Sequence, residues 1–275
     1  MNLKTPSHIL PKKHLGQHFL CDPAVRDRII EACDLQKNDM VLEIGPGLGV
    51  LTEGIASRAL HVYAVETDLP LCRELDKKFT GQNVTVLHAD ILQFPFGSLP
   101  SRLKVIGNLP YNISSPIIER MIVSRSQCRE IFITVQLEFG ERLIAKAGAK
   151  DYGALTCFVQ YYFRPEILFK IGKGAFRPAP KVTSCFIRLT PSGPGRLAGD
   201  EGWLFTVIRH AFQQRRKTIV NALGGLINKE FLLPALEQTG IQPKQRPETL
   251  SLEDFVRLAD ASKDIASGAR KKGRE

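Results

Sequence analysis

Apolar and polar residues alternate differently in the two parts of the chain. Up to about residue 189, short apolar runs typical of buried strands are separated by stretches with apolar residues at helical spacing. These runs lie within "DMVLEIG", "LHVYAVETD", "NVTVLHADIL", "LKVIGNLPY" and "REIFITVQ", and "VTSCFIRL" closes the region. Strands that alternate with helices are typical of parallel βαβ units. The pattern therefore predicts an α/β domain with a doubly wound, mostly parallel, Rossmann-like sheet.

Strand-like runs largely vanish in the last quarter of the chain. The stretch "PSGPGRLAGD" is rich in Pro, Gly and Ser, which is typical of a linker. Beyond it, "WLFTVIRHAFQQRRKTIVNALGGL", "EFLLPALEQTG" and "SLEDFVRLADAS" have the spacing of amphipathic helices. We predict an α/β domain over 1–190, a linker over 191–200, a small α-helical domain over 201–268 and a polar tail over 269–275.

The N-terminal segment and the cysteines limit the class of protein. No apolar run approaches the roughly 20 residues of a membrane span, and "MNLKTPSHILPKKH" lacks the apolar core of a secretory signal. We therefore expect a cytoplasmic protein without a membrane partner. None of the six cysteines forms a CxxC pair or lies at metal-ligand spacing from a histidine, so we expect reduced thiols and no metal site.

A glycine-rich turn follows the first predicted strand of the sheet. "VLEIGPGLG" places Gly45, Gly47 and Gly49 between a strand and a helix. The spacing differs from the dinucleotide fingerprint GxGxxG because residue 50 is Val, and Pro46 has no N–H to offer a phosphate. No GK[ST] P-loop sequence follows either. The turn therefore suits close approach of a ligand that lacks a pyrophosphate.

Two acids follow the next two strands. Glu66 lies about 20 residues beyond the turn, where doubly wound folds place an acid on ribose hydroxyls. Asp90 follows the third strand, where a carboxylate can accept a hydrogen bond from an exocyclic amine. Either acid alone could simply be solvated. Together with Gly45 and Gly47, at the carboxyl ends of the strands, they favour a nucleoside ligand, and S-adenosylmethionine fits that description.

The stretch "KVIGNLPYNISS" ends the fourth strand with two acceptors and an aromatic ring. The Asn108 side-chain carbonyl and the Leu109 main-chain carbonyl can each accept one N–H of an adenine N6, while Pro110 stiffens the turn. Tyr111 offers a flat face to a planar ring. Such acceptors would stabilise N6 as it becomes positively charged on methylation. The alternative is a turn with a purely structural role, in which the tyrosine only anchors the chain. The neighbouring nucleoside pocket makes this alternative the weaker one.

A proline-stiffened loop, "GAFRPAPKVTS", precedes the last run of the sheet. We expect Phe176 to cover the face of the base opposite Tyr111, an interaction worth about 1–3 kcal/mol per base. We expect Lys181 to meet a phosphate. A structural loop with a buried phenylalanine explains this stretch equally well when it is taken alone.

These motifs together resemble the bacterial small-subunit rRNA adenine-N6,N6-dimethyltransferase family. The similarity spans nearly the whole chain, and it rests on "KKHLGQHFL", "VLEIGPGLGVLT", "VETD", "ADIL", "GNLPYNISSPII", "FRPAPKV", "FQQRRKT" and "RPETLSLEDFVRLA". It implies that a methyltransferase domain adds two methyl groups to each of two adjacent adenosines in a hairpin loop near the 3′ end of small-subunit rRNA. The implied substrate is a pre-30S particle, and the implied protein is a monomer with a role in small-subunit biogenesis.

The resemblance also assigns contacts to the methyl donor. They are His18, Leu20, Gly45, Glu66, Asp90 and Asn108. Many relatives have Asn where this chain has His18. A main-chain contact at His18 would survive that exchange, whereas a side-chain contact would be altered.

The charge of the chain fits an RNA partner. The formal net charge is +10, and from Glu201 to Pro247 seven Lys and Arg stand against three acids. The predicted phosphate contacts outside Lys181 are Lys12, Lys13, Arg215, Arg216 and Lys217. Any one of them could instead belong to a solvated helix face.

Two other functions compete with small-subunit adenine dimethylation. The first is a large-subunit rRNA adenine methyltransferase of the macrolide-resistance type, which would share the donor pocket and the "NLPY"-like motif. The second is a non-catalytic ribosome-assembly or nucleic-acid-binding factor. The motifs of the helical domain favour the small-subunit family, and the intact stretch from Asn108 to Tyr111 favours catalysis.

Overall fold

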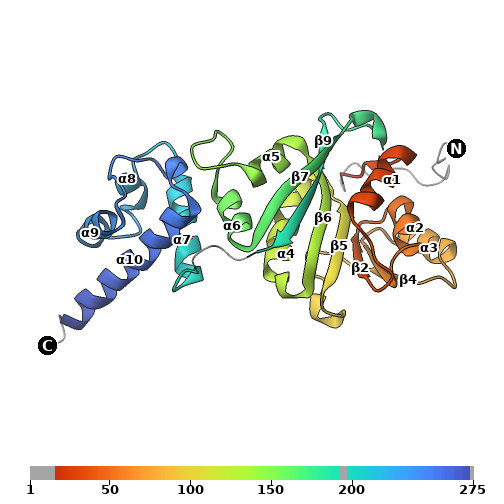
Figure 1. The fold of residues 1–275 in the computed structure, drawn as a ribbon, viewed down its shortest axis with the longest axis horizontal. Coiled ribbons are helices and arrows are strands. Elements are labelled where there is room, and N and C mark those ends of the chain that lie inside the picture. The colour runs from red at the N-terminus through yellow and green to blue at the C-terminus, as the bar shows by residue number, and fades with distance from the viewer. Residues whose placement is uncertain (1–15, 193–196, 273–275) are drawn as a thin grey trace. The chain divides into compact units, whose positions relative to one another are not determined.

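The computed structural model describes residues 16–192 and 197–272, with side chains up to residue 265. Its contacts divide into two units (Figure 1). The first holds the described residues up to Gly140 together with Arg164–Pro191, and the second holds Glu141–Phe163 and the described residues from Ser192 onward. The segment Glu141–Phe163 thus belongs with the C-terminal helices, although the sequence pattern placed it in the α/β domain.

A seven-stranded sheet in the order β4-β3-β2-β5-β6-β9-β7 forms the centre of the first unit. The strands from β4 to β6 pair in parallel, and β9 runs antiparallel to β6. The mostly parallel, Rossmann-like sheet is therefore confirmed. The strand bounds are β2 (Met40–Ile44), β3 (His61–Glu66), β4 (Val84–His88), β5 (Leu103–Asn108), β6 (Cys128–Gln136), β7 (Phe163–Ile171) and β9 (Ser184–Pro191).

Strand β7 and a small second sheet were missed by the sequence pattern. Strand β7 lies at the edge of the large sheet, where a proline such as Pro165 is tolerated, and most of its positions are exposed or only partly buried. It therefore lacks the apolar run by which a buried strand is recognised. The second sheet pairs two dipeptides, β1 (Phe19–Leu20) and β8 (Phe176–Arg177), which are too short to show any periodicity.

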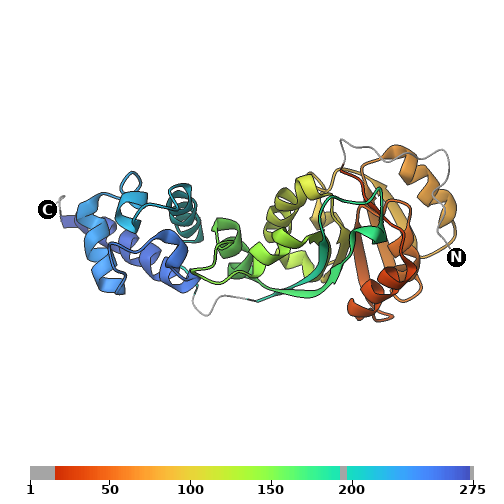
Figure 2. The ribbon, with the colours of Figure 1, turned by 90° about the horizontal axis from the view of Figure 1, so that it is seen from above.

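Helices cover both faces of the large sheet. Figure 2 shows α1 and α4 on opposite sides of it. Helix α1 begins at Pro23, and the Asp22 carboxylate caps it by accepting hydrogen bonds from the Ala24 and Val25 N–H groups. The helices of this unit are α1 (Pro23–Ala32), α2 (Val50–Ala56), α3 (Leu69–Lys78) and α4 (Ser114–Val123), and α5 (Leu137–Ile144) begins here and ends in the second unit.

The second unit is built from helices around an aromatic cluster. The ring of Phe205 lies 4.9 Å from that of Phe158 and 5.4 Å from that of Tyr161. The expected continuous helical stretch after Glu201 breaks at residues 214–218 into two helices. The helices of the unit are α6 (Ala154–Tyr162), α7 (Glu201–Gln213), α8 (Ile219–Leu223), α9 (Lys229–Thr239) and α10 (Leu252–Lys272). Within the described residues, no helix has both the length and the apolar character that crossing a membrane requires.

A buried ion pair ties the amino ends of β2 and β5 to the end of α1. Lys104 is 2% exposed, and its Nζ lies 3.0 Å from an Asp39 carboxylate oxygen and 3.0 Å from the carbonyl oxygen of Cys33. Arg129 binds the other Asp39 oxygen at 3.1 Å. Removing one partner of such a pair leaves a charge buried without compensation.

We predict that Asp39→Ala lowers the free energy of unfolding by about 3 kcal/mol, because the Lys104 ammonium loses its buried counter-ion. Urea denaturation followed by far-UV circular dichroism measures the change. The double variant Asp39→Ala/Lys104→Met, which removes both charges, should lose less. A single-variant effect below about 0.5 kcal/mol, the size typical of surface substitutions, would contradict this interpretation.

Candidate active site

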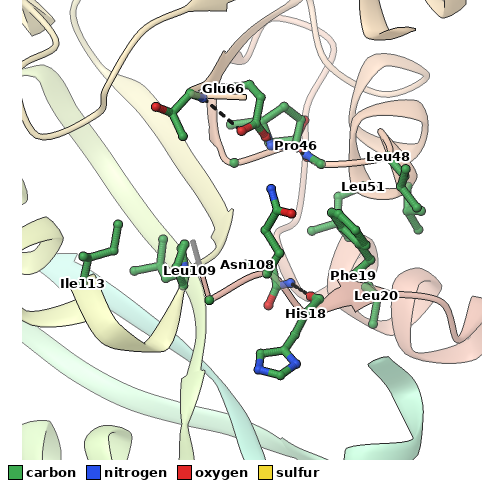
Figure 3. A pocket seen from close by; sticks show the side chains of 18 of the residues that line it. His18, Phe19, Leu20, Pro46, Leu48, Leu51, Glu66, Asn108, Leu109 and Ile113 are labelled. Atoms are coloured by element: carbon green, nitrogen blue, oxygen red, sulfur yellow. Dashed lines mark hydrogen bonds between the residues drawn. The ribbon is translucent and has the colours of Figure 1, made fainter. Parts of the chain in front are cut away.

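A cavity of about 250 Å³ lies at the carboxyl ends of β2, β3 and β5 (Figure 3). Its lining comes from four segments that are distant in the sequence, within 16–20, 43–51, 66–67 and 108–113. The sheet topology brings them together, since the carboxyl ends of parallel strands meet at one edge. The walls are largely apolar, with Leu20, Leu48 and Leu51 among them. This is the composition expected of a pocket for a small molecule with an aromatic ring.

The glycine turn is folded as its sequence requires. Gly45 and Gly47 have φ angles of 64° and 58°, a region that favours glycine. A Cβ atom on Gly47 would lie only 3.0 Å from the ring of Phe19, whereas one on Gly45 would meet no described atom within 4 Å. Gly45 therefore leaves open space at the cavity, and Gly47 lets the N-terminal segment pack closely.

Glu66 is held rigidly at the end of β3. Its carboxylate is 5% exposed and accepts hydrogen bonds from the N–H groups of Gly47 (3.1 Å), Thr67 (2.9 Å) and Asp68 (3.0 Å). Burial raises the pKa of the Glu66 carboxyl, and these backbone donors oppose the rise. Since each carboxylate oxygen has more than one acceptor position, the group can still accept hydrogen bonds from ligand hydroxyls.

Glu43 is a second buried acid at the cavity, and the sequence analysis missed it. It lies on β2, lines the cavity and is 1% exposed. Among the described residues, its Oε2 has no hydrogen-bond partner by distance and angle. Burial raises the pKa of Glu43 from 4.5 to about 7. A polar residue within an apolar run such as "MVLEI" was the only signal that could have revealed it.

Asn108 is anchored to the N-terminal segment. Its Nδ2 donates a hydrogen bond of 2.8 Å to the carbonyl oxygen of His18 (Figure 3). This bond fixes the orientation of the side-chain amide, so that the Oδ1 acceptor is left for another partner. The N–H of Leu109 donates to the Thr134 carbonyl oxygen at 3.1 Å, which ties the start of the turn to β6. The Pro110 carbonyl accepts a 3.1 Å hydrogen bond from the Ser114 hydroxyl, so it is already used by the following helix.

Tyr111 is fixed beside this turn rather than in the cavity lining. Its hydroxyl lies 2.6 Å from the Ser184 hydroxyl, and burial raises its pKa. The imidazole of His18 stacks on the Tyr111 ring, with centroids 5.3 Å apart and planes 26° from parallel. The His18 Nδ1 lies 2.7 Å from the Pro178 carbonyl oxygen. The His18 side chain therefore points away from Glu66, and its main-chain carbonyl faces Asn108 (Figure 3).

Comparison with known proteins identifies the family. The family described as "Ribosomal RNA adenine dimethylase" matches residues 10–264. The chain belongs to this family. Its relatives named "Ribosomal RNA small subunit methyltransferase A" include one from Hahella chejuensis, 43% identical over 90% of this chain and 92% of that one. Another, from Moorella thermoacetica, is 40% identical over 91% and 92% of the two chains. The family is one of S-adenosylmethionine-dependent methyltransferases.

Two solved structures of transferases share the fold. A dimethyladenosine transferase from Plasmodium falciparum is 28% identical, with a TM-score of 0.77 over 88% of this chain and 96% of that one. The 23S rRNA methyltransferase ErmE is 27% identical, with a TM-score of 0.69 over 89% and 99% of the two chains. The name of the second structure specifies 23S rRNA, whereas that of the first specifies no RNA, so the shared fold alone does not identify the substrate of this chain.

Two site predictions are not met in this structure. Phe176 is 1% exposed and packs in the core with Leu20 and Ile29, because pairing of β8 with β1 turns its ring inward. The structure therefore supports the alternative of a buried phenylalanine. Asp90 is exposed and lies outside the lining formed by the described residues, and its Oδ1 accepts from the Leu92 N–H at 2.9 Å.

The predicted RNA contacts differ in their surroundings. Lys12 and Lys13 lie outside the described residues, and Lys181 is exposed. Arg216 and Lys217 are exposed as well, whereas Arg215 is only partly exposed. Its Nε binds the Glu248 carboxylate at 2.6 Å, and its guanidinium also donates to the Lys150 carbonyl at 2.6 Å. Arg215 therefore anchors the loop from which Arg216 and Lys217 project. Within the described residues there is no group of three or more metal-ligating side chains.

We predict that Glu43→Gln removes a pH-dependent loss of stability. In the folded protein Glu43 takes up a proton below about pH 7, whereas in the unfolded chain it does so only near its ordinary value of 4.5. Folding with Glu43 is thus penalised increasingly as the pH rises from 4.5 through 7, and glutamine escapes this penalty.

Urea denaturation of Glu43→Gln and the unaltered protein at about pH 5 and pH 8 tests this prediction. The difference in the free energy of unfolding, variant minus unaltered protein, should be larger at about pH 8 than at about pH 5. Glu31→Gln, on the exposed face of α1, is the matched control. A Glu43→Gln effect that is the same at both pH values would show that the Glu43 carboxyl does not titrate in this range.

Proposed function

We propose that the protein dimethylates N6 of two adjacent adenosines in the 3′-terminal hairpin loop of small-subunit rRNA, with S-adenosylmethionine as the methyl donor. The proposed substrate is rRNA within a pre-30S particle in the cytoplasm, on which the protein acts as a monomer during small-subunit biogenesis. The names of relatives that share at least 40% of the sequence support the small subunit as the substrate. The observation that carries the chemistry is the anchored amide of Asn108 at the edge of the cavity.

The residues that line the cavity suit the binding of S-adenosylmethionine. Glu66, fixed by three backbone N–H groups, would accept hydrogen bonds from the ribose hydroxyls, and the leucine walls would cover the adenine. The Glu43 Oε2, which has no hydrogen-bond partner among the described residues, suits a ligand with positive charge. Gly45, His18 and Leu20 also belong to the lining. Asp90, just beyond β4, would join the site on binding. The donor supplies an electrophilic methyl group.

Asn108 and Leu109 would hold the adenine amine. The lone pair of N6 is delocalised into the adenine ring, so N6 must become tetrahedral and positively charged as it gains the methyl group. The Asn108 Oδ1 and the Leu109 carbonyl oxygen would accept its two N–H groups, and these hydrogen bonds strengthen as the charge develops. Because Asn108 is already anchored to His18, little reorganisation is needed during the reaction. N6 then loses a proton, and no strong base is needed before attack.

A basic surface of the second unit is the proposed rRNA contact. Arg215 joins two loops, since it binds main-chain carbonyls at residues 149 and 150 while Arg216 and Lys217 project from its own loop. The loop that contains residues 149 and 150 carries two more exposed lysines, Lys146 and Lys150, which the sequence analysis did not select. These exposed lysines and Arg216 lie on two loops that Arg215 joins. Positive charges grouped in this way suit the closely spaced phosphates of an RNA backbone.

Transfer of labelled methyl groups tests the proposed function. The purified protein is incubated with labelled S-adenosylmethionine and unmethylated small subunits, with large subunits in a parallel reaction, and the products are mapped by nucleoside mass spectrometry. We expect dimethyladenosine at two adjacent positions of small-subunit rRNA. Label confined to large-subunit rRNA would favour the macrolide-resistance type of enzyme, and no label at all would favour a binding factor. Either outcome overturns the proposal.

We predict that Asn108→Ala lowers the rate of methyl transfer at least about a hundredfold, because one of the two acceptors for N6 is lost in a water-excluded site. Affinity for the rRNA substrate should change less than about twofold, since most RNA affinity comes from phosphates. Single-turnover transfer and a filter-binding titration measure the two quantities. Equal losses of binding and transfer would show that Asn108 has a mainly structural role.

We also predict that the double variant Arg216→Ala/Lys217→Ala weakens rRNA binding and makes it less dependent on salt. Loss of two phosphate contacts should lower the slope of log affinity against log salt concentration by about 2. Lys229→Ala/Lys244→Ala, which removes the same charge from exposed positions of the same unit, is the control. If both double variants change the slope equally, only net charge matters and this surface is not the contact.

A further inference from the structure

Glu43 places a carboxyl with an unused oxygen at the donor cavity. It lies on β2, lines the cavity and is 1% exposed. Its Oε2 has no hydrogen-bond partner among the described residues. Glu66, the other buried acid of the lining, differs because three backbone N–H groups stabilise its charge. An ionised Glu43 therefore leaves one buried oxygen without compensation, and this oxygen can respond to the charge of a ligand.

Few charged groups lie close to Glu43. Burial is the largest effect on its pKa, which it raises, while the Thr52 hydroxyl of α2 favours the ionised form. The Glu66 carboxylate of β3 raises the pKa further, and the Lys78 ammonium of α3 lowers it. On the other side of β2, residues 105–107 of β5 pair beside Glu43 and carry no titratable side chain. The net result is a pKa of about 7 in the free protein.

The strand order places Glu43 between the groups proposed to hold the donor and the target amine. The sheet runs β3-β2-β5 at this point. Glu66, proposed for the ribose, ends β3, and Asn108, proposed for the adenine amine, ends β5; both lie at the cavity (Figure 3). The sulfur of the donor lies between its ribose and the amine that receives its methyl group. The sulfur is therefore expected over β2, the strand that carries Glu43.

We propose that Glu43 makes the cavity select the charged donor over the product, because it is ionised beside S-adenosylmethionine and protonated beside S-adenosylhomocysteine. The inference deepens the function proposed above and rests on it for the position of the methyl group. Both ligands carry an ammonium and a carboxylate, so they differ in charge only at the sulfur. Methyl transfer exchanges the S–C bond for an N–C bond, and N6 gives up one proton to solvent. Glu43 then takes up one proton from solvent, which removes its uncompensated charge.

The selection depends on pH in a defined direction. The donor favours ionised Glu43, so its binding expels the proton that the free protein holds at this carboxyl below about pH 7. Donor affinity should therefore rise about eightfold from pH 6 to pH 7.5, whereas affinity for S-adenosylhomocysteine should change less than about twofold. Glu66 meets a ribose that both ligands share, and the imidazole of His18 points toward Tyr111. Their titration therefore cancels in the ratio of the two affinities.

Calorimetric titration of the whole protein with each ligand, without RNA, tests this inference. Affinities are measured at about pH 6 and about pH 7.5, below the range near 8 in which the amino group of the ligands titrates. Repeating the titrations at about pH 6.5, in buffers with different enthalpies of ionisation, counts the protons released. S-adenosylmethionine should release about three-quarters of a proton, the share that a group with a pKa of about 7 holds at this pH. S-adenosylhomocysteine should release none.

Glu43→Gln removes the titrating group, and Glu31→Gln, on the exposed face of α1, is the matched control. In Glu43→Gln the affinity for the donor should change less than about twofold between the two pH values, and no proton should be released. Its preference for S-adenosylmethionine over S-adenosylhomocysteine at pH 7.5 should be several times smaller than in the unaltered protein. Glu31→Gln should behave like the unaltered protein in all three measurements.

Two results on the unaltered protein would overturn the inference without relying on any variant. One is the same change of affinity with pH for both ligands, and the other is donor binding without proton release. A Glu43→Gln variant that keeps the full pH dependence would also overturn it, by assigning the titration to another group. No RNA enters these titrations. A wrong rRNA substrate would therefore appear only in the methyl-transfer assay, and a failure here would leave that assay unchanged.

Discussion

The hydrogen bond from the Asn108 side chain to the His18 carbonyl is the interaction on which the site depends. It joins the end of a central strand to the segment that crosses the carboxyl edge of the sheet. It fixes one edge of the cavity proposed for the methyl donor. Among the described residues, it leaves the oxygen of the amide available for the substrate. Donor site and base site are therefore built around one amide, and the distance between them is fixed by the sheet rather than by a mobile loop.

Two buried carboxyls make part of the otherwise apolar cavity wall acidic. Glu66 is fully supported by backbone donors, whereas Glu43 is left with an unpartnered oxygen, and burial raises the pKa of both. An uncompensated buried acid costs stability, and such a cost is typical of sites shaped for a ligand. A methyl donor with a positively charged sulfur would relieve it, while the neutral product left after transfer would relieve it less. By charge, the cavity would therefore favour the donor over the product.

Much of the fold was predictable because strands, caps and the glycine turn leave local signals. The Asp-Pro sequence at residues 22 and 23 is a local signal of a helix start, and the parallel strands follow from apolar runs and their spacing. Where the surroundings of a residue differ from the expectation, the cause is physical. Phe176 and Arg215 were assigned to ligands from local sequence motifs, but tertiary packing turns the ring into the core and pairs the guanidinium with Glu248. Glu43 was overlooked because its burial depends on neighbouring strands. The edge strand β7 lacks the apolar run on which such predictions rest.

The most direct test is a crystal structure of the protein with a non-reactive analogue of S-adenosylmethionine and an RNA hairpin that carries the target adenosine. The account predicts that adenine N6 lies about 3 Å from both the Asn108 Oδ1 and the Leu109 carbonyl oxygen, with the Asn108 Nδ2 still bound to the His18 carbonyl. An adenine whose N6 contacts neither oxygen, or an Asn108 that has left His18, would contradict it.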